Sequence, residues 1–289
     1  MRATLPGWTL AAAGLLAAAP ADAAAQTYRT LSASRQRVNE EHLTVHVQFA
    51  AGTFQLLPDL QGALYRARVV YDEERFEPVS RFDRSANELH IGVSGEGLRG
   101  GVGRSGLREQ RLELAIAPDV PLALDLELGA VEADLRLGGL SIREARMRMG
   151  ASQTTVWFDA PNGVACERLE MEVGAAEFTL HGLGNARCEH VSLQGGAGDF
   201  TLDLGGSWDV DGIAAITIEV GVAAVKLRIP RNLGVELEVH RFLAAFERSG
   251  FTKRGSSYYS NGYDTATRKI SLDISTAIGD IDVEWTERQ

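Results

Sequence analysis

Apolar and polar residues alternate along much of this chain, and the alternation returns in similar segments that each carry a glycine near the middle. The four clearest copies are residues 124–135 (LDLELGAVEADL), 169–180 (LEMEVGAAEFTL), 191–202 (VSLQGGAGDFTL) and 216–227 (ITIEVGVAAVKL). Weaker copies are residues 145–156 (ARMRMGASQTTV) and 272–283 (LDISTAIGDIDV), the second with Ala277 in the glycine position. A period of two is typical of a β-strand with one buried face. Each copy therefore predicts two short strands, one on either side of the glycine.

The aligned glycines indicate how the copies are arranged. They follow one another at spacings of 21, 24, 22 and 25 residues and are Gly129, Gly150, Gly174, Gly196 and Gly221. With no helical stripe between copies, this spacing predicts an all-β fold, a solenoid-like stack of short strands in which each aliphatic side chain contacts its counterpart one coil away. One column would hold Leu126, Met147, Met171, Leu193 and Ile218, and another Leu135, Val156, Leu180, Leu202 and Leu227. Antiparallel meander strands are the alternative, because alternation alone does not assign pairing partners.

The outward-facing positions test this register independently, since unlike charges on neighbouring strands attract and like charges repel. Two outward-facing columns precede the glycine. One consists of Asp125, Arg146 and Glu170, and the other of Glu127, Arg148 and Glu172, so each arginine is predicted to lie between two carboxylates. Three residues after the glycine, the copies hold Glu132, Gln153, Glu177, Asp199 and Ala224. Glu177 and Asp199 offer the oxygen ligands that Ca²⁺ takes, but a solvated acidic edge that discourages self-association is the simpler interpretation. We therefore predict no metal and no cofactor.

The two ends of the chain differ from the middle and are expected to cap the stack. Residues 26–118 are predicted to form an N-terminal β cap and a first coil, with two or three antiparallel strands over residues 65–91. The glycine- and arginine-rich segment 94–111 has no apolar period and is expected to be a mobile surface loop. The solenoid repeats are expected over residues 119–240, followed by a C-terminal β-hairpin cap and last coil over residues 241–289.

The N-terminus has the composition of a secretory signal peptide. Arg2 precedes an apolar stretch over residues 8–19, and a small-residue segment follows up to Ala25, with cleavage expected after Ala25 or Ala23. The stretch is shorter than the about 20 residues that span a bilayer, and no second long apolar run follows. The sequence thus predicts a cleaved signal peptide over residues 1–25. The mature chain, without a transmembrane segment, is expected in the periplasm, outside the cell or at its surface.

Charge and motif context exclude several functions. The chain has 29 Lys and Arg against 39 Asp and Glu, a net charge of −10, so we expect no binding to nucleic acid. A G-x-G-x-x-G match at residues 95–100 lacks the preceding buried strand and the following helix of a dinucleotide site. His42 and His46 would have metal-ligand spacing only on a helix, and the residues around them favour a strand. We predict no enzymatic activity. A carbohydrate-active β-helix enzyme is an alternative, because pairs of carboxylates are plentiful.

The two cysteines of the chain hold the same position in adjacent copies. Cys166 precedes Gly174 by eight residues, and Cys188 precedes Gly196 by eight. In a solenoid such positions lie one strand spacing apart, about 4.8 Å, within the about 4.4–6.8 Å between Cα atoms that a disulfide accepts. An oxidising compartment would allow this structural disulfide to form. Two buried, reduced cysteines are the alternative.

Several motifs, in their order along the chain, resemble those of the toast-rack domain. They are the repeated glycine units, VVYD at residues 69–72 followed by Pro78, DVPL at 119–122, GVEL at 234–237, SGFTK at 249–253, GYD at 262–264 and IGDI at 278–281. That domain is found in LiaF-type cell-wall-active antibiotic response proteins and related adhesin-like proteins. The resemblance implies a stack of short strands in an extracytoplasmic module with a binding or scaffolding role in envelope-stress systems. It carries over no catalytic residue.

We therefore expect a non-catalytic interaction or scaffold module of the bacterial envelope, whose partner is an unknown envelope protein or glycan. Unlike LiaF-type proteins, this chain has no predicted membrane helices and carries a cleavable signal instead. That difference argues against direct regulatory contact with a membrane sensor kinase. A surface adhesin that binds glycan or protein is the alternative.

Overall fold

The computed structural model describes residues 27–94 and 109–287, which fold into a 15-stranded β-sheet with no α-helix in these ranges. The predicted signal peptide, the G-x-G-x-x-G match and most of the predicted loop at 94–111 lie outside the described residues. None of the helical segments found in the described ranges has the length and hydropathy needed to cross a bilayer. The strands are β1 (Tyr28–Gln36), β2 (Leu43–Pro58), β3 (Ala63–Asp72), β4 (Glu77–Asp83), β5 (Glu88–Ser94), β6 (Arg111–Ile116), β7 (Leu122–Arg136), β8 (Ile142–Trp157), β9 (Cys166–His181), β10 (Cys188–Asp203), β11 (Ala214–Pro230), β12 (Leu233–Phe246), β13 (Phe251–Arg254), β14 (Ser257–Ser260) and β15 (Arg268–Thr286).

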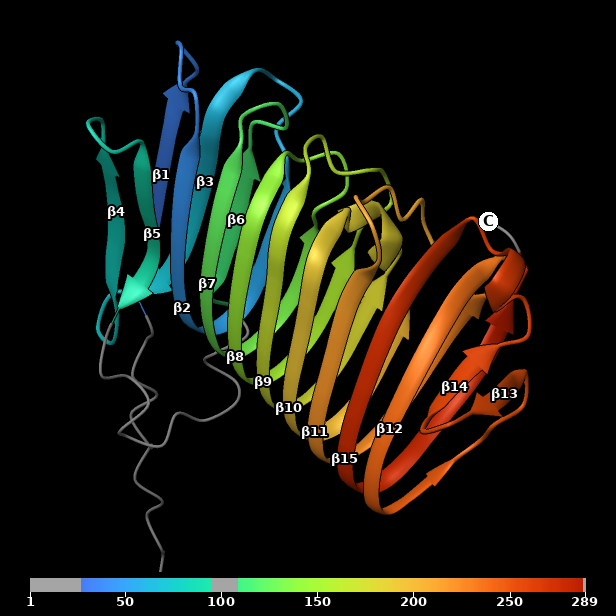
Figure 1. Ribbon diagram of the computed structural model, residues 1–289. Coiled ribbons are helices and arrows are strands. Elements are labelled where there is room, and N and C mark those ends of the chain that lie inside the picture. Colours follow the sequence, from blue (N-terminus) through green and yellow to red (C-terminus); the bar gives the residue numbers. More distant parts are fainter. Residues whose placement is uncertain (1–26, 95–108, 288–289) are drawn as a thin grey trace, which may run out of the picture.

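The repeats form the centre of the molecule. Strands β7 to β11, each 15 to 17 residues long, lie side by side in parallel, which confirms the stacked coils and overturns the antiparallel meander. The two short strands predicted in each copy are the two arms of one continuous strand, which bends near its middle (Figure 1). The glycine lies in the middle of the strand, as Gly174 does in β9. Because each strand turns back at the bend, its arms face each other and enclose the core.

The two aliphatic columns predicted from the alternation are register partners in the structure. One runs through Leu126, Met147, Met171, Leu193 and Ile218. The other runs through Leu135, Val156, Leu180, Leu202 and Leu227. All of these side chains are at most 1% exposed, and burial of each contributes about 1.5–3 kcal/mol relative to exposure. The core therefore rests on contacts between identical positions of successive coils.

The column of glycines allows neighbouring strands to approach closely at the bend. A Cβ atom added to Gly174 would lie 2.8 Å from the carbonyl oxygen of Gly150, and one added to Gly196 would lie 2.7 Å from that of Gly174. The same contact would be 3.0 Å from Gly150 to Gly129 and 2.7 Å from Gly221 to Gly196. A side chain at these positions would push the backbones apart, because only glycine has no Cβ atom. The repeat glycines thus set the spacing of the central coils.

Separate strands cover the two arms of the first coil at the N-terminal end. β2 extends the stack beside β7, β5 pairs in parallel with one arm of β2, and β6 pairs in parallel with the other. β4 and β5 form an antiparallel hairpin with a turn at residues 84–87. β3 pairs antiparallel with β1 and β6.

At the C-terminal end, the order of strands in space departs from their order in the sequence. β15, which contains the last repeat copy, lies between β11 and β12 and is parallel to both. The hairpin of β13 and β14 pairs with β12 only at Glu236 and Leu237. The predicted boundary at residue 240 lies inside β12. The bend of β12 is therefore at the end of the stack, without a further long strand beside it in the described part of the chain.

Candidate interaction surface

A row of exposed apolar side chains crosses the bend of the stack, one residue after the glycine column. Its members are register partners on six neighbouring strands and are Ala151, Ala175, Ala197, Val222, Ile278 and Leu243. The alanines lie on β8 to β10, and the large side chains lie on β11, β15 and β12. Phe242 precedes Leu243 at the same bend. We call Val222, Ile278, Leu243 and Phe242 together the apolar ridge.

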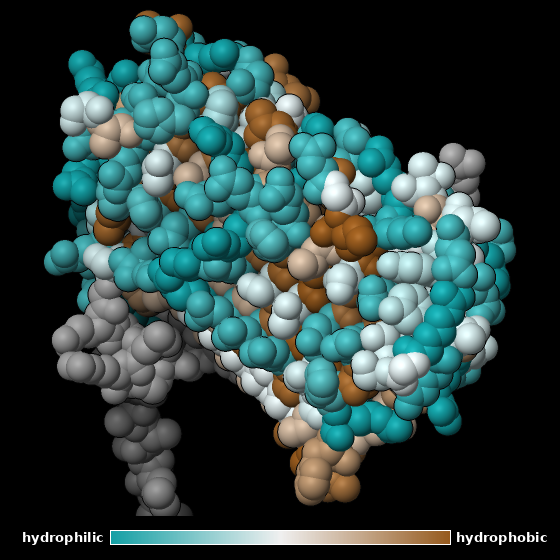
Figure 2. All heavy atoms as spheres, in the orientation of Figure 1, coloured by the Kyte–Doolittle hydropathy of each residue, from teal (hydrophilic) through white to brown (hydrophobic). Residues whose placement is uncertain are grey.

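The ridge is open to solvent. Phe242 is 81% exposed, Leu243 64%, Val222 53% and Ile278 46%. These side chains project because the bend turns them away from the core, and because the stack ends at β12. Figure 2 shows hydrophobic atoms gathered at the lower tip of the molecule, where β15 and β12 bend in Figure 1. Clustered, exposed apolar groups of this size are typical of interaction sites.

Polar side chains border the row on both sides. A shallow hollow of about 830 Å³ runs over the glycine column beside the row, and its lining includes one border, formed by Glu127, Arg148, Glu172, Gln194 and Glu219. The other border is formed by Glu132, Gln153, Glu177 and Asp199. The two borders together contain six carboxylates and one guanidinium, so they are acidic. This arrangement favours a partner that places basic groups beside the part of its surface that covers the ridge.

The arginines predicted between carboxylates lie there in the structure. Arg146 is the register partner of Asp125 and Glu170, and its Nε and Nη2 donate to Glu170 Oε2 at 2.8 and 2.6 Å. This hydrogen bonding raises the pKa of the Arg146 guanidinium. Arg148 Nη2 donates to Glu127 Oε1 at 2.6 Å and to Asp125 Oδ1 at 3.2 Å. These contacts link neighbouring coils on the outer face of the arm before the bend.

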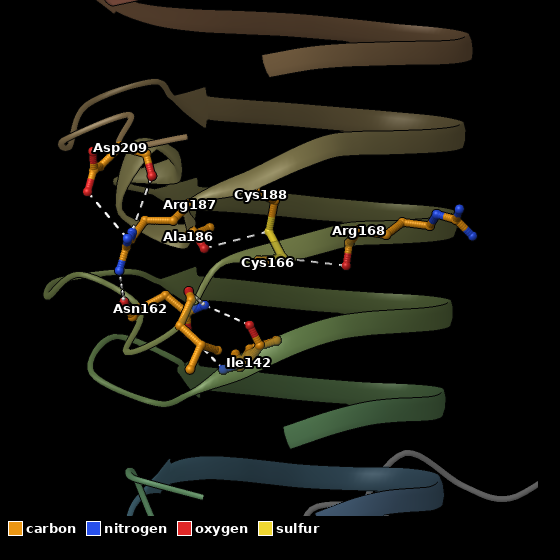
Figure 3. Close-up of a disulfide and its surroundings, with 9 residues drawn as sticks. Ile142, Asn162, Cys166, Arg168, Ala186, Arg187, Cys188 and Asp209 are labelled. Carbon is orange, nitrogen blue, oxygen red and sulfur yellow. Dashed lines mark hydrogen bonds and ion pairs between the residues drawn. A yellow bond between two sulfur atoms is a disulfide. The ribbon is translucent and has the colours of Figure 1, made fainter. Parts of the chain in front are cut away.

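Cys166 and Cys188, at the starts of β9 and β10, form a disulfide with Cα atoms 4.2 Å apart. Figure 3 shows that the bond joins adjacent coils. Nearby, the side chain of Asn162 accepts from the Ile142 backbone N–H at 2.8 Å and donates to the Ile142 carbonyl at 2.7 Å. Arg187 Nη1 donates to the Asn162 carbonyl at 3.1 Å (Figure 3). The cysteines therefore have a structural position, in which they tie two coils together where the loops enter the stack.

Two groups of side chains in the described ranges are close enough to share a metal ion. They are His46 with Glu88 and His90, and Glu238 with His240 and Asp273. Glu177 and Asp199, the residues considered for Ca²⁺, are register partners on the acidic border and belong to neither group. The sequence did not reveal either group, because each draws its members from different strands. His42 lies outside them, just before β2 begins.

A second hollow, of about 1200 Å³, lies at the ends of β8 to β11. Its lining includes Trp157 and His181, which are register partners with stacked rings whose centroids lie 4.0 Å apart. On the preceding coil, the guanidinium carbon of Arg136 lies 5.6 Å from the indole centroid. Partial burial lowers the pKa of His181. Because neighbouring coils cover both faces of the indole, Trp157 presents only its edge to a ligand.

Comparison with known protein families gives the identity of the chain. The family profile described as the N-terminal domain of toast_rack, DUF2154, matches residues 22–167, about half of the chain. The chain belongs to the toast-rack family. A second profile, described as cell wall-active antibiotics response LiaF, C-terminal, matches residues 182–283. No curated protein matches this toast-rack chain in sequence.

Several solved structures are similar to this toast-rack protein. A proposed cell adhesion protein from Clostridium sporogenes is 16% identical with a TM-score of 0.47, and the match covers 90% of this chain and 100% of the other. A proposed adhesin from Bacteroides fragilis is 11% identical with a TM-score of 0.43, covering 89% and 97%. A proposed lipid binding protein from Parabacteroides distasonis is 9% identical with a TM-score of 0.36, covering 90% and 96%. At these values the matches carry no argument about function.

The apolar ridge is absent from the expectations drawn from the sequence, although a signal for it is present. The alternation changes phase at each glycine, so that inward residues are even-numbered before Gly221 on β11 and odd-numbered after it. Val222 follows the glycine and belongs to neither inward set. An apolar residue at this position is therefore expected outside, and the same holds for Ile278 after Ala277 on β15.

Proposed function

We propose that this toast-rack protein is an extracytoplasmic, non-catalytic interaction module of the bacterial envelope, and that the apolar ridge binds a protein partner. The observation that carries the proposal is the exposure of four large apolar side chains in adjoining positions of the stack. A complementary surface that covers them gains about 25 cal/mol for each Å² of apolar area removed from water. The hydrogen-bonded stack holds the strands of the ridge in place, so binding requires little ordering of the backbone.

The envelope location is supported in three ways. The signal peptide that the sequence predicts over residues 1–25 would direct the chain out of the cytoplasm. The disulfide between Cys166 and Cys188 is of a kind that forms and persists in oxidising compartments. The C-terminal part matches the profile of a cell wall-active antibiotics response protein, which supports a role in envelope stress.

The acidic borders flank the alanine part of the row beside the ridge, reach the ridge strands at Glu219 on β11, and bear on the class of partner. They and the net charge of −10 disfavour an anionic lipid surface, which would be repelled. They favour an envelope protein that places an apolar group on the ridge and basic groups on the acidic borders beside it. The first candidate function is therefore protein binding.

A glycan-binding adhesin is the second candidate, supported by the polar lining of the 1200 Å³ hollow at the ends of β8 to β11, which includes Asn185, Asp203 and Arg228. We prefer protein binding, because a sugar ring that stacks on an aromatic side chain needs an open ring face. The covered faces of Trp157 do not supply one.

Photo-crosslinking in living cells tests the proposal. A photoreactive phenylalanine analogue at position 242 should give an adduct with one envelope protein. The same analogue in place of Lys226, which is exposed on the arm of β11 that follows the bend, should give none. The adduct should disappear in Leu243→Asp and Ile278→Asp variants that retain the wild-type circular dichroism spectrum. Adducts that are the same from both positions, that persist in the Asp variants, or that contain only a second copy of this chain would refute the proposal.

A further inference from the structure

We propose that His46, Glu88 and His90 bind a divalent transition-metal ion of the Zn²⁺ type between β2 and β5. The parallel pairing of these strands makes His46 and His90 register partners and places Glu88 two residues before His90 on the same face. The two imidazole rings stack with centroids 4.8 Å apart and an angle of 12° between their planes. The sheet itself therefore assembles two nitrogen ligands and one carboxylate from residues far apart in the sequence.

The donor atoms already have the spacing of a coordination sphere. His46 Nε2 lies 3.1 Å and His90 Nε2 lies 2.7 Å from the same oxygen, Glu88 Oε1. All three ligand atoms lie within 4.8 Å of one another. Zn²⁺ bonds of about 2.0–2.1 Å in tetrahedral geometry place ligand atoms about 3.3 Å apart, so small side-chain movements suffice to receive the ion. Two histidines and a glutamate also form one of the ligand sets that zinc uses when a fourth position is left open.

Asp125 on β7 is placed to orient the first ligand. Its Oδ2 lies 3.4 Å from His46 Nδ1, and its Oδ1 accepts a hydrogen bond from Arg148 Nη2 at 3.2 Å. A carboxylate at Nδ1 favours the tautomer with its proton there and leaves the Nε2 lone pair available for the metal. Asp125 is therefore a positioning residue, held by Arg148 and acting through His46.

The position of the group gives the ion access and a structural effect. The side chains of His46, Glu88 and His90 are 36%, 31% and 29% exposed, and a hollow of about 190 Å³ lies against both histidines. Water or a ligand from a partner can complete the coordination from this side. A bound ion would fasten the β4–β5 hairpin to β2. There β5 pairs with six residues of β2, from Thr44 to Phe49.

Calorimetric titration with ZnCl₂ tests the site. The full chain, expressed with its own leader, purified without a histidine tag and stripped with a chelator, should bind one Zn²⁺ per chain. His46→Gln/His90→Gln should weaken binding by more than about 100-fold, and Asp125→Asn by about 10- to 100-fold. The matched control is His240→Gln, which alters the other group, where His240 Nε2 lies 4.0 and 3.8 Å from Glu238 and Asp273. This variant should bind as the wild type does.

Two further readouts separate coordination at this site from loss of fold. Co²⁺ should give the intense visible absorption of tetrahedral coordination in the wild type but not in the double variant. Zn²⁺ should raise the melting temperature of the wild type and of His240→Gln but not that of the double variant. Excess Ca²⁺ should not compete, because the nitrogen ligands do not suit a hard cation. Circular dichroism verifies that each variant is folded. A wild type that binds no Zn²⁺, or a folded double variant that binds with wild-type affinity, would overturn the proposal.

Discussion

Reversal of charge at Arg146 and Arg148 should destabilise the stack in a salt-dependent manner. Each arginine lies on β8 between carboxylates of β7 and β9. In the Arg146→Glu/Arg148→Glu variant, the contacts with Glu170, Glu127 and Asp125 become contacts between like charges. The perturbation leaves the buried columns untouched, so it isolates the electrostatic part of the register.

The structure sets the expected magnitude. The contacts with the three carboxylates are 2.6, 2.6 and 3.2 Å long, between side chains that are 24% to 50% exposed. At such exposure each ion pair contributes about 0.5 kcal/mol, and a like-charge pair destabilises by a similar amount. The reversal should therefore lower the free energy of unfolding by about 3 kcal/mol. In a chain of this size that corresponds to a fall in melting temperature of about 6–10 °C.

Thermal unfolding followed by circular dichroism measures the effect. At about 10 mM salt the full fall is expected, and at about 1 M salt, where the Debye length is about 3 Å, at least half of it should be recovered. Arg143→Glu is the matched control, because Arg143 lies 3.9 Å from Glu167 and both side chains are largely exposed. Its melting temperature should change by no more than about 2 °C. A double variant that has the melting temperature of the wild type at low salt, or whose fall in melting temperature does not respond to salt, would refute the reasoning.

Three further perturbations test other parts of the molecule. Mass spectrometry of non-reduced mature protein from an oxidising compartment should find Cys166 joined to Cys188, and reduction should lower the free energy of unfolding by about 3 kcal/mol; two free thiols would contradict the pairing. Gly198→Ala should destabilise the protein by more than about 3 kcal/mol, because its Cβ would lie 1.8 Å from a carbonyl oxygen of β9. Gly212 also has a positive φ but has open space around it, so Gly212→Ala should lower the free energy of unfolding by only about 1 kcal/mol. Equal losses for the two variants in urea unfolding would show that the close approach of the strands at Gly198 is unimportant. Burial lowers the pKa of His181 in the folded protein from its ordinary 6.5. The neutral imidazole therefore contributes its full share to the free energy of unfolding above pH 6.5, and this contribution is lost as the pH falls through the pKa of the folded state. His181→Gln should flatten that decline in unfolding free energy, and an unchanged pH profile would argue against this role.

The register of the central coils could be predicted from the sequence because several signals agree. The inward aliphatic columns, the glycine column and the alternating charges around Arg146 all require the same alignment of β7 to β11. A shift of one residue would turn every inward side chain outward, so the buried face specifies this alignment strongly.

The strand order at the C-terminal end could not be predicted in the same way. β12 carries inward residues such as Val235 and Leu237 in the same alternation as Ile270 and Leu272 of β15. Either strand has an apolar face that fits against β11, and alternation does not specify the neighbour. The choice depends on how the chain between β12 and β15 folds back as β13 and β14. The phase change at the bend marks Val222 and Ile278 as outward in the sequence, but only this strand order brings them beside Leu243 in one ridge.

The stack brings Val222, Ile278 and Leu243 into one ridge in the order β11, β15, β12, and the proposed binding surface depends on this order. Paired cysteine substitutions, with disulfides mapped by mass spectrometry after mild oxidation, test this order directly. We predict crosslinks for Val222→Cys with Ile278→Cys and for Ile278→Cys with Leu243→Cys, since both pairs are register partners about 4.8 Å apart. Val222→Cys with Leu243→Cys, two strand spacings apart, should not crosslink. A crosslink between positions 222 and 243, with none between 222 and 278, would place β12 beside β11 and contradict the ridge.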